Sequence, residues 1–149
     1  MHVRRAAILD TVQIARLSSQ LGYPLSDAES HERLTTLLSL PTQVVFVVDS
    51  GSGLAGWASG ELRISLESGL RVEITGLVVD ETRRHQGLGT LLMSHIERWA
   101  LSQNCSILLV RSNVARQEAH PFYERLGYQR AKTQHSYKKV LHADAELSR

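Results

Sequence analysis

Apolar positions along the chain recur with two periods, and these periods predict a series of helices and strands. Intervals of three and four residues are typical of an amphipathic helix, whereas short β-branched runs indicate strands. Helices are predicted at 10–21, at 26–40, from the end of the polar loop 81–89 to 103, and at 117–126. Strands are predicted at 3–8, 44–48, 54–66, 71–79, 107–110, 128–131 and 136–141.

This order of elements predicts one α/β (α+β) domain over residues 1–149. Two helices precede a run of strands, so we expect a mixed, mostly antiparallel sheet of six or seven strands flanked by about four helices. The chain has 149 residues, a usual length for a single domain. Residues 142–149 are interpreted as a flexible tail.

Composition narrows the function classes. Lys and Arg number 17 against 15 Asp and Glu, a net charge of +2, which is too small to indicate a nucleic-acid partner. The apolar run Val44–Val48 is far shorter than the about 20 residues of a membrane helix. Cys105 is the single cysteine, and no spacing suits a metal site. We expect a cytoplasmic protein without metal, nucleic-acid or membrane partners.

The segment Arg84-His-Gln-Gly87-Leu-Gly89 carries the chemistry. It joins a predicted strand to a predicted helix, and free N–H groups at a helix start attract anions. Glycines let a phosphate approach the backbone, and Arg84 adds positive charge. The spacing fits neither a P-loop nor a Rossmann turn. By itself, this loop can equally be a structural turn.

A second motif strengthens the interpretation. The strand Gly76-Leu-Val-Val-Asp80 precedes the loop, and Asn113 is followed by Ala119-His-Pro-Phe-Tyr-Glu-Arg-Leu-Gly-Tyr128. The two motifs together resemble the coenzyme A region of the GNAT N-acetyltransferase superfamily. The resemblance spans about residues 71–128 and is looser over 1–70. His85 stands where many members carry Gly.

The resemblance implies a GNAT-like fold with acetyl-CoA as co-substrate. Backbone groups of one strand would meet the pantetheine arm, the loop would hold the pyrophosphate, and later residues would line the thioester end. The implied coenzyme residues are, in that order, Leu77, Val78 and Val79; Arg84, His85, Gln86, Gly87, Leu88, Gly89 and Thr90; and Asn113, Phe122 and Tyr123. Arg116 is a candidate for the 3′-phosphate.

The resemblance also implies direct attack of an amine on the thioester. Glu73, the only acidic residue between Arg71 and Val79, is the candidate base, and Tyr123 the candidate that assists the leaving thiolate. Alternatives stay open: Glu73 can be a solvated strand residue, Tyr123 a packing residue, and His120 or His135 the base.

The acceptor is predicted to be a small-molecule or peptide primary amine of unidentified structure. Candidate acceptor-binding residues are Tyr23, Trp57, His120 and His135. A non-catalytic acyl-CoA-binding or regulatory module on the same fold is the alternative function. A homodimer paired through the C-terminal strands is a further expectation.

Overall fold

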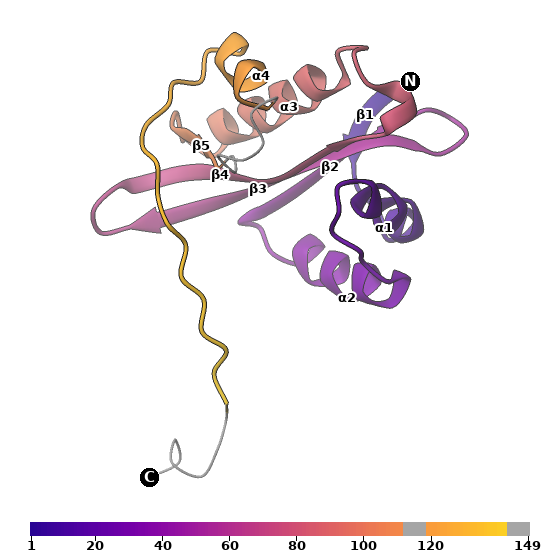
Figure 1. Ribbon diagram of the computed structural model, residues 1–149, viewed down its shortest axis with the longest axis horizontal. Coiled ribbons are helices and arrows are strands. Elements are labelled where there is room, and N and C mark those ends of the chain that lie inside the picture. The colour runs from indigo at the N-terminus through magenta and orange to yellow at the C-terminus, as the bar shows by residue number, and fades with distance from the viewer. Residues whose placement is uncertain (112–118, 143–149) are drawn as a thin grey trace. The chain divides into compact units, whose positions relative to one another are not determined.

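The computed structural model describes residues 1–111 and 119–142 (Figure 1). The chain forms two compact units, Met1–Arg111 and Ser112–Arg149. The first unit holds the sheet, three α-helices and two short 3-10 helices, Ile8–Asp10 and Glu81–Arg83. Among its described residues, the second unit holds one short helix, α4 (Ala119–Arg125). None of the described helices is long and apolar enough to cross a bilayer.

One five-stranded sheet organises the first unit, with its strands in the order of the sequence. Adjacent strands are antiparallel except β4 and β5, which are parallel. β-branched and apolar residues fill the central strands, as burial on both faces favours. The strands are β1 (His2–Arg5), β2 (Gln43–Asp49), β3 (Leu54–Ser65), β4 (Gly69–Val79) and β5 (Leu108–Val110).

Helices cover both faces of this sheet (Figure 1). Helices α1 (Thr11–Gln20) and α2 (Asp27–Leu38) lie on one face, and α3 (Leu88–Ser102) lies on the other. The predicted capping box of α2 is confirmed: Ser26 Oγ accepts from Glu29 N–H at 3.0 Å, and Glu29 Oε1 accepts from Ser26 N–H at 3.1 Å. These bonds satisfy two backbone donors at the helix start.

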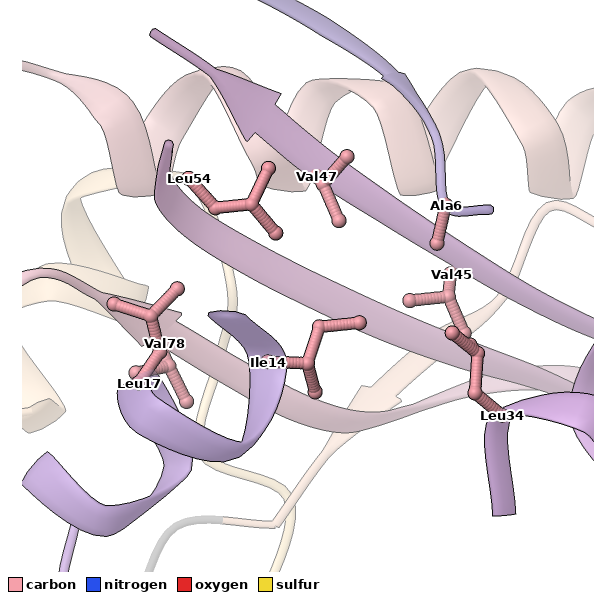
Figure 2. Packing of buried hydrophobic residues seen from close by; sticks show 8 residues of the cluster. All are labelled: Ala6, Ile14, Leu17, Leu34, Val45, Val47, Leu54 and Val78. Atoms are coloured by element: carbon pink, nitrogen blue, oxygen red, sulfur yellow. The ribbon is translucent and has the colours of Figure 1, made fainter. Parts of the chain in front are cut away.

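The core between α1, α2 and the sheet is built from aliphatic side chains (Figure 2). Leu17 of α1 is fully buried, and Leu34 of α2 is nearly so. They pack with Ala6, which follows β1, with Ile14 of α1, and with four strand residues: Val45, Val47, Leu54 and Val78. Val78 belongs to β4, so this cluster holds β4 against α1 and positions the site described below.

The predicted mixed, mostly antiparallel sheet is confirmed, but the described residues form five strands of it rather than six or seven. Segments 128–131 and 136–141 form no strand, and their exposed side chains include Tyr137 and Leu141. Val140 is the single β-branched residue in the two segments, so their strand propensity is low. The dimer pairing expected of them therefore has no strand to use. Of the predicted tail, only His142 lies within the described residues.

Candidate active site

The junction between β4 and α3 presents free backbone N–H groups. Gly87 caps α3 with a left-handed φ of 78°, and Leu91 N–H donates to the Gly87 carbonyl at 3.0 Å. The N–H groups of residues 88–90 precede that bond and have no partner within the helix. A Cβ built on Gly87 has no atom within 4 Å, so the backbone there faces open space. An anionic phosphate fits such a helix start.

Asp80 ties this loop to α1. Its Oδ1 accepts from Thr82 N–H at 3.1 Å, and its Oδ2 accepts from Arg16 Nη1 at 3.2 Å. Gln20 Oε1 accepts from Glu81 N–H at 2.9 Å. The Thr82 N–H lowers the pKa of Asp80 below its ordinary value, and Arg16 acts in the same direction against the opposing effect of burial. The carboxylate thus holds the loop in place in its charged form.

His85 adopts φ of 64°, in the left-handed region. A side chain costs about 1–2 kcal/mol in this conformation, which is the physical reason that glycine suits the position. The side chains of Arg84, His85 and Gln86 are exposed. All three are therefore accessible to a ligand at the loop.

The edge of β4 that faces β5 is paired over a short stretch only. In the part of the chain that the structure describes, β5 pairs with Val72–Ile74 and ends at Val110. Among the described residues, the segment from Thr75 to Val79 has no β5 partner. Backbone polar groups at such an edge require other partners, and a ligand that carries amides can supply them.

A bulge in β4 decides which side chains share a face. Gly60 pairs with Ile74 and Ser59 pairs with Gly76, so Thr75 is an extra residue. Trp57 pairs with Val78, and Glu61 pairs with Glu73. Because alternate residues of β3 share a face, Glu73 lies on the α1–α2 face with Gly76 and Val78. Without the bulge, Glu73 and Val78 would lie on opposite faces.

The ring of Trp57 lies over Gly76. A Cβ on Gly76 would stand 2.5 Å from ring atoms Cη2 and Cζ3 of Trp57, so only glycine fits there. Trp57 packs beside Leu21 and Leu37 against the core cluster. Its Nε1 is buried and has no hydrogen-bond partner among the described residues. A buried donor of this kind is costly unless a ligand or water accepts from it.

We expect Gly76→Ala to lower the free energy of unfolding by about 1–3 kcal/mol, because the added methyl overlaps the Trp57 ring. Denaturant unfolding of four chains measures this: wild type, Gly76→Ala, Trp57→Ala and the double variant. Trp57→Ala removes the overlapping ring, so Gly76→Ala should cost much less in that background. An equal cost in both backgrounds contradicts the contact.

Two arginines hold Glu73, which is only 8% exposed. Arg63 Nη1 donates to its Oε2 at 2.6 Å, and Arg111 Nε pairs with its Oε1 at 3.0 Å. Glu73 is therefore not the solvated strand residue that the alternative interpretation required. A carboxylate has about four acceptor positions, so two remain for an amine or a water.

The second unit carries three aromatic rings in contact. The ring centroids of Phe122 and Tyr123 on α4 lie 5.2 Å apart with planes at 71°, and those of Tyr123 and Tyr128 lie 6.2 Å apart at 72°. Edge-to-face pairs of this kind fix ring orientation. Tyr123 thus makes the packing contacts that its alternative interpretation assigned to it, and these contacts leave a catalytic role open.

The other predicted site residues are scattered. Tyr23 is 65% exposed in the connection between α1 and α2, His120 is half-buried on α4, and His135 is exposed. Asn113 and Arg116 lie outside the described residues. Within the described ranges, no group of three or more His, Cys, Asp or Glu side chains is arranged to hold a metal ion.

Sequence reasoning missed the partners of Glu73. The sequence alone assigns neither Arg63 nor Arg111 to the site, yet both pair with Glu73. The three residues lie on different segments, so only strand pairing brings them together. The one sequence signal for this cluster is the presence of charged residues on both predicted strands, Glu61 and Arg63 on one and Arg71 and Glu73 on the other.

Comparison with known proteins identifies the family. The sequence model of the Acetyltransferase (GNAT) family matches residues 11–128. The chain belongs to this family. As a member of the GNAT family, this chain is an N-acetyltransferase. The resemblance to that family predicted from the sequence is confirmed.

Similar proteins agree with this assignment. An uncharacterised N-acetyltransferase of Bacillus subtilis (strain 168), YhdJ, is 23% identical over 104 residues, which cover 68% of this chain and 73% of YhdJ. Aminoglycoside 6′-N-acetyltransferase AAC(6′)-Ig from Acinetobacter haemolyticus has a TM-score of 0.83 at 18% identity, covering 95% of this chain and 100% of that chain. Glucosamine-6-phosphate N-acetyltransferase from Arabidopsis thaliana has a TM-score of 0.79 at 22% identity, covering 92% and 97%. The two structures show that the GNAT chain shares their fold.

Proposed function

We propose that this chain transfers the acetyl group of acetyl-CoA to a primary amine through a ternary complex. One observation carries the proposal: three features follow one another along β4 and the loop after it. Glu73 is buried on one face, the β4 edge has no β5 partner after Ile74 within residues 1–111, and the loop leads to the open start of α3. Donor and acceptor groups can therefore meet along one strand.

The donor follows from the chemistry of the loop and the strand edge. Acetyl-CoA supplies an acetyl group activated as a thioester. The N–H groups of residues 88–90 and the Arg84 guanidinium would bind its phosphates. Backbone groups of Leu77–Val79 would bind its amide-bearing arm, and a backbone N–H near Val78 would polarise the acetyl carbonyl. A structure of the similar enzyme AAC(6′)-Iy in complex with CoA supports this donor.

Glu73 is the proposed proton acceptor for the amine. An amine with a pKa of about 10.4 is mostly protonated at pH 7 and must lose a proton before it attacks. Glu73 is on the face that carries Trp57 and Gly76, and its unused acceptor positions can take the proton directly or through a water. Arg63 and Arg111 fix the carboxylate in one orientation.

Tyr123 is proposed to stabilise the leaving thiolate by a hydrogen bond. A thiol pKa near 8.5 and a phenol pKa near 10 differ by about 1.5 units, or about 2 kcal/mol. Full proton transfer from an ordinary tyrosine is therefore uphill, whereas hydrogen bonding to the developing negative charge is favourable.

The test follows free thiol released from acetyl-CoA with and without a pool of primary amines. Wild type should release thiol only when amine is present. Tyr123→Phe should lower the turnover by about 10²-fold, the lower range for loss of one hydrogen-bond donor to a developing negative charge, while the aromatic contacts and the affinity for acetyl-CoA remain. Full turnover of Tyr123→Phe rejects the role of the hydroxyl, and thiol release that ignores amines contradicts amine acetylation.

A further inference from the structure

The α1–α2 face of the β3–β4 hairpin carries more cations than anions around Glu73. In the register of the two strands, Arg63 lies opposite Arg71, and Glu61 lies opposite Glu73. Alternate residues share a face, so these four side chains lie together, and Arg111 reaches them from the end of β5. The cluster thus contains three guanidinium groups and two carboxylates.

Arg63 and Arg111 form the salt bridges with the carboxylates of Glu61 and Glu73. Arg63 Nη1 is 2.6 Å from Glu73 Oε2, and Arg63 Nε is 3.5 Å from Glu61 Oε1. Arg111 Nε is 3.0 Å from Glu73 Oε1. Arg71 makes no salt bridge within residues 1–111, and its Nε is buried without a hydrogen-bond partner there. The uncompensated charge of the cluster is therefore that of Arg71.

A guanidinium in this position needs an anion. Arg71 is half-buried; its buried Nε–H costs free energy without an acceptor, and two arginines directly opposite each other repel. The planar guanidinium offers paired donors that match the geometry of a carboxylate or a phosphate. Arg71 is two residues from Glu73 along β4, which is about 7 Å.

We propose that the acceptor amine carries an anionic group, a carboxylate or a phosphate, which binds to Arg71 while its amine lies at Glu73. This inference rests on the proposed function and names its substrate class: a compact amine with an anion about 7 Å away. A polycationic acceptor such as an aminoglycoside meets repulsion at this cluster, although aminoglycoside acetyltransferases share the fold.

The test is calorimetric titration of matched amines into the chain loaded with coenzyme A, which has no acetyl group to transfer. The pairs are butylamine against 4-aminobutanoate and glucosamine against glucosamine 6-phosphate, with spermidine as the polycation. In at least one pair, the amine that carries a carboxylate or phosphate should bind ten or more times more tightly than the amine that lacks it, about 1.4 kcal/mol per tenfold. The carboxylate and phosphate arms show which anion is used.

Arg71→Met should remove that preference and leave the affinity for the amine without an anionic group unchanged, whereas Arg71→Lys should keep part of the preference. Arg33→Met is the matched control, since Arg33 is an exposed residue of α2 that pairs with Glu29 at 3.3 Å. Unfolding curves show whether each variant is folded.

Several outcomes overturn the inference. Three results each reject it while acetyl-CoA binding persists. In the first, amines without an anionic group bind as tightly as those that carry one, and in the second, spermidine binds most tightly. The third is that Arg71→Met weakens binding of both members of a pair equally. A chain that binds no acetyl-CoA rejects the proposed function, and this inference with it.

Discussion

Glu73→Gln is expected to lower kcat/KM for acetyl transfer by about 10²–10⁴-fold, the usual contribution of a general base. Glutamine keeps the size of the side chain but cannot accept the proton of the amine. The affinity for acetyl-CoA should change little, because the loop at the start of α3 is untouched. Initial rates with saturating acetyl-CoA, together with a calorimetric titration of the coenzyme, measure the two effects separately.

The matched control is Glu32→Gln, the same chemical change at an exposed position of α2. It should leave kcat/KM unchanged. Glu73→Gln also loses an ion pair with Arg63 and Arg111, so thermal unfolding must show that the variant remains folded at the assay temperature. A folded Glu73→Gln with wild-type kcat/KM rules out Glu73 as the base and directs the search to His120 and His135.

Gly89→Trp is expected to weaken acetyl-CoA binding by about 100-fold or more, which corresponds to about 2.7 kcal/mol. Gly89 is the second residue of α3 and stands among the free N–H groups of that helix start. An indole there would occupy the space that a phosphate must enter. Helix propensity rises when glycine is replaced, so the loss should not come from unfolding. Calorimetric titration with acetyl-CoA measures it.

Leu101→Trp controls for the added indole, since Leu101 is 63% exposed in the last turn of the same helix. It should bind acetyl-CoA as wild type does. Wild-type affinity in Gly89→Trp would place the coenzyme elsewhere on the chain. Equal loss in both variants would point to a general disturbance of α3.

Local rules predicted the helices and the loop well. Ser26 and Glu29 form the capping box that their spacing indicates. Gly87 adopts a left-handed φ, which costs conformational free energy for any residue with a Cβ. Each of these features depends on neighbours a few residues away. The same locality explains why the loop that we propose for the coenzyme can be recognised from its glycines and arginine.

The face of Glu73 could not be predicted, because it depends on pairing between strands. A period of two places Glu73 and Leu77 on one face, whereas the bulge at Thr75 puts Glu73 with Gly76 and Val78 instead. The arginine partners of Glu73 come from β3 and from the residue after β5. No spacing along one segment indicates such a cluster.

The central claim is acetyl transfer from acetyl-CoA to an amine nitrogen. The most direct measurement incubates the chain with acetyl-CoA and the matched amines, and identifies the products by mass spectrometry. We expect an N-acetylated product from an anionic amine with wild type, and far less with Glu73→Gln. Saturable acetyl-CoA binding with no acetylated amine would contradict the claim and would favour a non-catalytic acyl-CoA-binding module.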